Sequence, residues 1–161
     1  MTIPQLEVLA RAAAQKHGID EALFCALCDH ESGWNTYAIR YEPAFMSKYV
    51  APQYTIGKIS ATEAYARSFS WGLGQIMGQT AREFGLEGGS LAELCNPEVG
   101  LEYAAKKLAN ALQKTEGDVT AALLRYNGGA NAAYPGLVKN LIPKYQNTNF
   151  LVVQAAANGE T

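Results

Sequence analysis

The chain has 161 residues, of which 48% are hydrophobic, and a net charge of −2. This length predicts a single domain that can bury an apolar core. The weakly acidic balance disfavours nucleic-acid binding, because no basic field is present to neutralise phosphates. No apolar run is long enough to predict a membrane span. Nine tyrosines and two tryptophans instead suit a neutral or mixed polymer such as a sugar chain.

The N-terminal segment 1–7 has neither a basic start nor an apolar core, so it predicts no signal peptide. We therefore expect the chain to be made in the cytosol, to be exported by another route, or to be a trimmed form. Its three cysteines are an odd number, which excludes a full disulfide framework. Cys25 and Cys28 lie in an apolar helical pattern beside His30, but a second ligand pair is missing. We expect structural thiols, with no metal and no cofactor.

Two helices are predicted at the N-terminus. The first opens at residues 2–5, where Thr, Pro and Gln form a capping box with proline in the first turn, and Gly18 ends it. The second follows the cap residue Asp20 and carries the apolar run 22–28. Gly33 ends it, because glycine adopts the positive φ that a helix C-terminal cap often requires.

The last turn of this second helix delivers Glu31 to a surface or cleft. A carboxyl at the mouth of an apolar wall, next to Trp34, loses hydration, which raises its pKa and suits it to general acid catalysis. The simpler interpretation is a solvated charge at a helix end. Asp29 lies two residues earlier, on roughly the opposite helix face, and we expect it to be structural.

Residues 34–59 look irregular and contain six aromatic residues, two prolines and a glycine. A segment this aromatic predicts a groove wall rather than a linker, with short helical or strand turns and one small hairpin as an option. Beyond it, helices are expected from 60 to about 67, from 75 to 84, in a short piece after Ser90, from Pro97 to about Thr115, from 119 to 126, and from about 132 to 145 with an interruption near Pro135-Gly136.

The fold class is therefore mainly α, with one domain over residues 1–161 and a core within 5–145. The long helix after Asn96-Pro97 has an apolar stripe on one face. The tail 147–161 carries an apolar patch at 150–153, and we expect part of it to pack and its end to fray.

Four short segments occur in a recognisable order: Glu31-Ser32, Gly72–Met77, Asn96-Pro97 and Ala122–Gly129. Together they resemble the soluble lytic transglycosylase domain, a branch of the lysozyme-like superfamily that includes goose-type lysozymes. The resemblance covers residues 5–145 and implies a lysozyme-like multi-helix domain with a substrate groove for peptidoglycan glycan strands.

The resemblance implies specific roles. Glu31 matches the catalytic glutamate, and Ser32 follows it with a hydroxyl that bonds nearby backbone. Tyr126 and Asn127 match a Tyr-Asn pair whose tyrosine hydroxyl approaches the catalytic carboxyl. Gln75 and the adjacent Ile76 belong to a segment that lines the groove. The family's methionine before this glutamine is Gly74 here, which we expect to leave more room. Stacking candidates for sugar rings are Trp34, Tyr41 and Trp71.

The implied reaction cleaves the β-1,4 bond between N-acetylmuramic acid and N-acetylglucosamine. Glu31 first protonates the glycosidic oxygen and then, as a carboxylate, accepts the proton of the C6 hydroxyl, which closes a 1,6-anhydro ring without water. Alternatively, Glu42 activates a water and the chain is a goose-type lysozyme hydrolase. A more ordinary role for Glu42 is pairing with Arg40.

An alternative from another class is an inactive wall-binding or virion structural module that kept the fold. The segment 38–43 is similar to ones in bacteriophage members of the family, which favours a phage protein. We expect a monomer or part of a phage particle, acting in the bacterial periplasm or cell wall and delivered by a virion or released at lysis.

Overall fold

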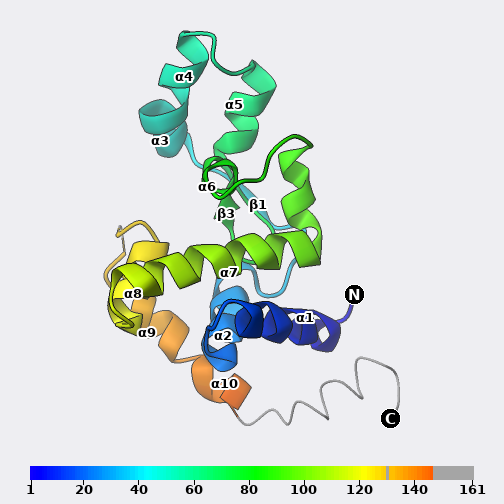
Figure 1. Cartoon of the computed structure of the whole chain (residues 1–161), viewed down its shortest axis with the longest axis vertical. Helices are drawn as coiled ribbons and strands as arrows, with labels where there is room; N and C mark the ends of the chain where they lie inside the picture. Colours follow the sequence, from blue (N-terminus) through cyan, green and yellow to red (C-terminus); the bar gives the residue numbers. More distant parts are fainter. Residues whose placement is uncertain (130, 147–161) are drawn as a thin grey trace.

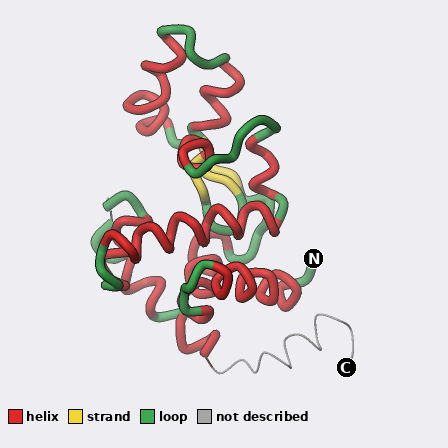
Figure 2. Tube along the Cα trace, in the orientation of Figure 1, coloured by secondary structure: helices red, strands yellow, loops and turns green. Residues whose placement is uncertain are grey.

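The computed structural model describes residues 1–129 and 131–146, and over these the chain is mainly helical with one small antiparallel sheet (Figure 1, Figure 2). The expected mainly α, lysozyme-like class is confirmed. The predictions for the tail 147–161 lie outside the described residues. The elements are α1 (Ile3–Lys16), α2 (Glu21–Ser32), β1 (Ile39–Tyr41), α3 (Pro43–Phe45), a π-helix (Met46–Val50), α4 (Ala51–Thr55), α5 (Ala61–Arg67), β2 (Phe69–Trp71), β3 (Ile76–Met77), α6 (Gly78–Glu83), a 3₁₀ helix (Leu91–Cys95), α7 (Pro97–Lys114), α8 (Val119–Tyr126), α9 (Tyr134–Lys139) and α10 (Ile142–Gln146).

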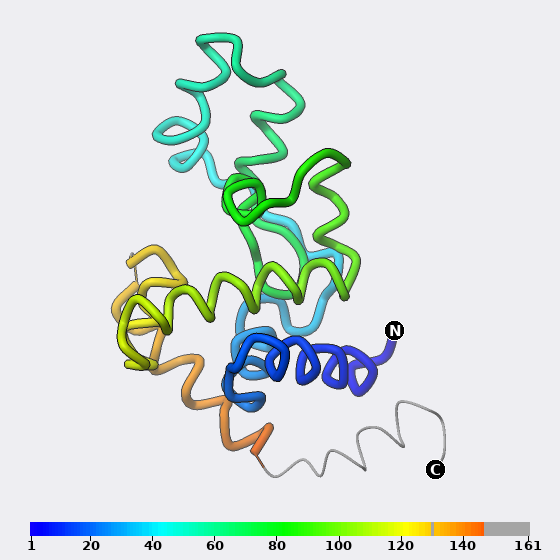
Figure 3. Tube along the Cα trace, viewed as in Figure 1, coloured from blue at the N-terminus to red at the C-terminus, as the bar shows by residue number. Residues whose placement is uncertain are grey.

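Helix α7 crosses the middle of the molecule and separates two parts (Figure 1). Above it lies the sheet lobe, residues 39–83, in which the three strands lie between short helices and α7 (Figure 2). Below it, α2 packs against α1, α9 and α10, and α7 packs against α1 and α8. The first and last described helices therefore both pack against α2 in the lower part, whose chain path Figure 3 shows.

The apolar run of α2 forms the centre of the core. All seven residues from 22 to 28 are buried, including the free thiols of Cys25 and Cys28. The Asp20 carboxylate caps this helix by accepting from the Leu23 amide at 2.8 Å. Gly33 ends it with φ of 57°, in the left-handed region. These local signals fix the place in the chain where Glu31 leaves the core.

The segment 34–59 is more regular than expected. It contains one strand, two short α-helices and a π-helix, and its strand β1 pairs with β2 rather than folding into a hairpin of its own. The hairpin is formed by β2 and β3. The helix expected from residue 75 begins only at Gly78, because residues 76 and 77 pair with β2. Pairing with distant residues here overrides the local helical pattern.

The helix predicted from about 132 to 145 is divided in the structure, but the division does not lie near Pro135-Gly136 as expected. Pro135 lies in the first turn of α9, where its missing N–H has no helical partner to lose. The interruption comes instead at residues 140–141, before α10. Within residues 1–129 and 131–146, no helix has both the length and the apolar character needed to cross a bilayer.

Candidate active site

A cleft of about 540 Å³, here called the central cleft, separates the sheet lobe from the helices below it. The strands β1, β2 and β3 contribute residues from one side, and α7 and α8 contribute from the other. Glu31 lines this cleft from the last turn of α2. The sequence pattern therefore predicted correctly that the buried helix ends with a carboxyl at a cleft.

The Glu31 carboxyl is held by a tyrosine hydroxyl. Tyr134, from the start of α9, donates a hydrogen bond to Glu31 Oε1. Burial raises the pKa of Glu31 above its ordinary value, although this hydrogen bond and the charge of Lys107 act in the opposite direction. The carboxyl therefore stays protonated to a higher pH than a solvated glutamate, as a general acid requires.

The tyrosine that holds Glu31 is not the one expected. Tyr126 is buried, and its hydroxyl donates to the backbone carbonyl of Gly74 at 2.7 Å. The predicted donation from Tyr126 to Glu31 is therefore wrong. Tyr134 lies 103 positions beyond Glu31, and its only sequence signal is an aromatic residue before a helix-opening proline. Tyr126 still lines the central cleft and stays a predicted site residue.

Lys107 is a further cleft residue that the sequence analysis did not identify. Its amino group lies 4.0 Å from the centre of the Tyr126 ring. Burial lowers the pKa of Lys107 to about 8, and the nearby Glu31 counteracts this. A signal was present: Lys107 is three residues after Ala104 and four before Ala111, both buried, so it shares their helix face.

Alternation along the strands decides which sheet residues reach the cleft. Arg40, Ser70 and Met77 are paired across the sheet, and all three line the central cleft. The neighbours on the strands point to the other face. The structure thus removes Tyr41, Trp71 and Ile76 from the expected set of substrate contacts.

Each of these three side chains has a structural environment instead. The Tyr41 ring packs against Phe69, with centroids 5.3 Å apart. The Trp71 indole N–H donates to the carbonyl of Ala66 at 2.9 Å. Ile76 is only 1% exposed and belongs to the core.

Trp34 is also a core residue, and its predicted stacking on a sugar is wrong. Its side chain is buried, and its indole N–H donates to the Tyr145 hydroxyl at 2.9 Å. That hydroxyl in turn donates to Asp29 at 2.7 Å, and Lys144 donates to the same carboxylate at 2.8 Å. The structural role expected for Asp29 is confirmed.

Gln75 lines the cleft, but its side chain is occupied by the protein. Its Oε1 accepts from the Ser70 hydroxyl at 2.9 Å, and its Nε2 donates to the carbonyls of Ala38 and Gly72 at 3.0 and 2.9 Å. It therefore connects the residue before β1 to the β2–β3 turn. Its backbone has a φ of 46°, which is unusual for a residue other than glycine.

The extra room expected at Gly74 does not exist. A Cβ at this position would lie 2.4 Å from the Ala104 Cβ and 3.0 Å from the Tyr126 hydroxyl. Glycine instead allows the turn after β2 to pack directly on α7. The expectation was wrong because α7 and Tyr126 fill the volume that a side chain would occupy.

The remaining predicted residues lie near Glu31 or in the cleft. Ser32 donates its hydroxyl to the Cys28 carbonyl at 3.0 Å, which confirms the backbone bond expected of it. Asn127 lines the cleft, and its Oδ1 is buried with no hydrogen-bond partner among the described residues. Glu42 lines the cleft as well, and its carboxylate accepts from the Arg40 guanidinium at 2.6 Å.

The described residues contain no group of three or more histidine, cysteine, aspartate or glutamate side chains that could hold a metal ion. The chemistry that the cleft itself offers is acid–base chemistry. Glu31, with its raised pKa, and Lys107, with its lowered pKa, line the central cleft, and the buried Tyr134 donates to the Glu31 carboxyl.

The chain matches the family model described as the transglycosylase SLT domain over residues 8–148. No solved structure gives a significant match. The matched span covers most of the chain and contains Glu31, Tyr126, Tyr134 and every residue named in the central cleft. The chain therefore belongs to the transglycosylase SLT domain family.

Proposed function

We propose that this chain is a peptidoglycan lytic transglycosylase that cleaves the β-1,4 bond between N-acetylmuramic acid and N-acetylglucosamine. The observation that carries the proposal is the environment of Glu31. Its carboxyl has a raised pKa, lies in a cleft and is held by a tyrosine donor. Family membership supplies the substrate class.

Glu31 acts first as an acid. Its proton passes to the glycosidic oxygen while the bond from that oxygen to C1 breaks, and the substrate's own N-acetyl oxygen bonds to C1. Glu31 is then a carboxylate, and it accepts the proton of the C6 hydroxyl. The C6 oxygen bonds to C1 and displaces the N-acetyl oxygen. This closes the 1,6-anhydro ring, and no water is consumed.

Two neighbouring side chains stabilise the Glu31 carboxylate during the step in which it is ionised. The Tyr134 hydroxyl donates to the carboxylate, and the charge of Lys107 attracts it; both interactions lower the pKa of Glu31. They oppose the burial that favours the protonated form. The same carboxyl can therefore release a proton and recover one, as a residue that serves as both acid and base requires.

Asn127 offers a specific substrate contact. Its Oδ1 is a buried acceptor without a partner among the described residues, and a buried polar group left unpaired is costly. An N-acetyl N–H in the central cleft would satisfy it. Asn127 is thus a candidate for substrate binding whose acceptor has no partner among the described residues.

Hydrolysis is the second candidate, because a second carboxylate, Glu42, lines the same cleft. In that scheme Glu42 activates a water and the product has a reducing end. The ion pair with Arg40 favours the transglycosylase scheme, since it occupies one oxygen of Glu42. An inactive structural module is disfavoured, because such a module needs no cleft carboxyl of raised pKa. The cell wall as place of action and a phage origin stay predictions.

Two measurements test the proposal. Glu31→Gln should lower cell-wall clearing by about 10²-fold or more, because the proton donor is lost. Asp29→Asn is the matched control on the same helix, outside the central cleft, and should keep its clearing activity. Wild-type activity in Glu31→Gln would remove this residue from the mechanism.

Mass spectrometry of the products separates the two reactions. Anhydro-muropeptides are about 18 Da lighter than hydrolysis products, by the one water that is withheld. Reducing-end products that disappear in Glu42→Gln would establish the hydrolase instead.

A further inference from the structure

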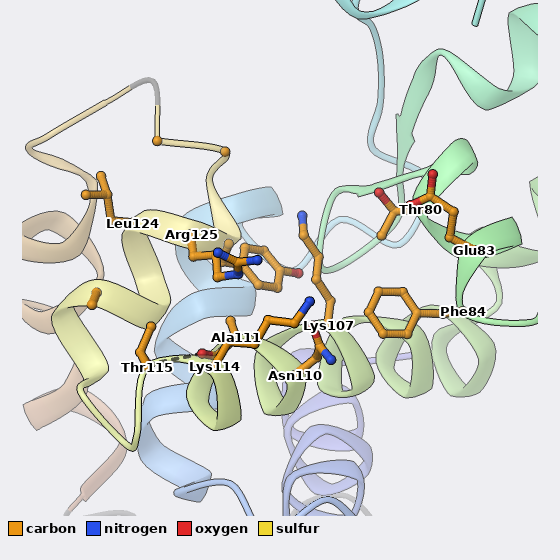
Figure 4. A pocket seen from close by; sticks show the side chains of 14 residues that line it. Thr80, Glu83, Phe84, Lys107, Asn110, Ala111, Lys114, Thr115, Leu124 and Arg125 are labelled. Carbon is orange, nitrogen blue, oxygen red and sulfur yellow. Dashed lines mark hydrogen bonds between the residues drawn. The ribbon is translucent and has the colours of Figure 1, made fainter. Parts of the chain in front are cut away.

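A second pocket, here called the side pocket, lies beside the central cleft. It has a volume of about 860 Å³ and is lined by α6, α7, α8 and the Gly128-Gly129 turn (Figure 4). Thr80, Lys107 and Arg125 line both pockets. The two spaces therefore adjoin, and a ligand in the cleft can extend into the side pocket.

The side pocket concentrates positive charge in a chain whose net charge is negative. Its lining contains three cations, Lys107, Lys114 and Arg125, and one carboxylate, Glu83. Figure 4 shows these side chains around the same space. The carboxylate accepts a hydrogen bond from Gln79 at 2.9 Å, and it forms no ion pair with a pocket cation among the described residues.

Two of the cations are available to a ligand. Lys114 and Arg125 are exposed, and neither forms an ion pair or a side-chain hydrogen bond within residues 1–129 and 131–146. By contrast, Glu102 on α7 is paired with Lys16 at 3.0 Å. Apolar surface from Phe84 and Leu124 lies next to the free cations. Such a pocket fits a flexible ligand that has both carboxylates and aliphatic groups.

We propose that the side pocket binds the stem peptide of peptidoglycan, with Lys114 and Arg125 pairing with its carboxylates. The inference rests on the proposed function, because it places N-acetylmuramic acid in the central cleft. The stem peptide branches from that sugar and carries free carboxylates. Arginine pairs well with carboxylates through two parallel hydrogen bonds. Arg125 lies at the junction of the two pockets, where the peptide leaves the sugar.

If the inference is correct, the enzyme prefers glycan strands that carry stem peptides. Two glycan substrates test this preference. One is peptidoglycan with its stem peptides, and the other is the same glycan after an amidase has removed them. Wild type should have the higher kcat/KM on the peptide-bearing strands. Lys114→Glu should lower that value by about fivefold and leave the value on stripped glycan unchanged. Lys114 is the residue to change because it lines the side pocket alone.

Lys58→Glu is the matched control, because Lys58 is exposed and lines neither pocket. This variant makes the same charge reversal in the sheet lobe. It should leave kcat/KM unchanged on both the peptide-bearing and the stripped glycan. Lys114→Met serves as a second variant that removes the charge without reversing it at a helix end. Equal wild-type rates on the two substrates, or equal loss in the Lys114 and Lys58 variants, would overturn the inference.

A binding measurement separates failure of the inference from failure of the proposed function. Calorimetric titration of Glu31→Gln would use two probes, N-acetylglucosaminyl-N-acetylmuramyl tetrapeptide and the same disaccharide without peptide. The peptide-bearing probe should bind about fivefold more tightly, and adding Lys114→Glu should abolish that preference. Equal binding of both probes would overturn the side-pocket assignment even if the wild-type enzyme cleaves glycan. A preference that depends on Lys114 would support it even if no cleavage is seen.

Discussion

The hydrogen bond from Tyr134 to Glu31 leads to a prediction that joins stability, pH and activity. Tyr134→Phe removes the hydroxyl and leaves the buried ring in place. A hydrogen bond to an ionised group contributes about 1.5–3 kcal/mol, and one between neutral groups about 0.5–1.5 kcal/mol. The loss in unfolding free energy should therefore be larger at a pH where Glu31 is ionised than at a pH where it is protonated.

The sign follows from the pKa of Glu31. Burial raises this pKa in the folded protein, so the stability associated with the protonated carboxyl is present at low pH and is lost as the pH rises through the folded pKa. The Tyr134 hydrogen bond opposes the burial. Removing it should raise the pKa of Glu31 further, and the destabilisation of Tyr134→Phe should grow over that pH range.

Thermal unfolding and a pH–rate profile measure the two effects. For a chain of this length, each kcal/mol changes the Tm by about 2–4 °C, so the Tm should fall by about 3–12 °C at pH 8 and by less at pH 5. The basic limb of the profile should move to higher pH, because it reports the pKa of the acid. The maximal rate should fall by about tenfold or more, since the carboxyl loses its positioning partner.

Tyr145→Phe is the matched control. Tyr145 also donates to a carboxylate on α2, but that carboxylate is Asp29, outside the central cleft. The control should lose stability and keep the basic limb of wild type. An equal Tm decrease at pH 5 and pH 8 in Tyr134→Phe, together with an unmoved basic limb, would refute the reasoning.

Three further substitutions test other parts of the site. Gly74→Ala places a Cβ 2.4 Å from the Ala104 Cβ and should cost about 1–3 kcal/mol of unfolding free energy, measured by urea denaturation; wild-type stability would contradict the packing. Lys107→Met removes a charge that lowers the pKa of Glu31, so the basic limb of the rate on peptide-free glycan should move to higher pH, and an unchanged limb would exclude the coupling. Trp34→Phe should cost about 1–2 kcal/mol through its lost hydrogen bond and leave the KM for glycan unchanged, whereas an increased KM would restore its role in sugar stacking.

Gly136→Ala is the control for Gly74→Ala. A Cβ at Gly136 would meet no atom within 4 Å, although the residue lies in a helix, α9. Alanine should therefore be tolerated or stabilising there, because it favours the helix more than glycine does. If only Gly74→Ala lowers the unfolding free energy, the loss at position 74 results from close packing and not from the replacement of a glycine as such.

Local chemistry determined the helical framework from the sequence alone. Caps such as Asp20 and Gly33, and the apolar run between them, depend on residues within one or two helical turns, so they could be located without a structure. The same signals placed Glu31 at the end of a buried helix. They also showed that Asp29 points away from it, since helical geometry separates residues two positions apart.

Only the tertiary structure decided which side chains share the cleft with that carboxyl. Tyr134 rather than Tyr126 reaches Glu31 because α9 packs against α2, a contact that no local pattern encodes. Strand pairing with residues far along the chain turned Tyr41 and Trp71 away from the cleft and brought Arg40 and its partners into it. Helix caps and periodicity are properties of neighbouring residues, whereas a site is a property of packing, and packing depends on the whole chain.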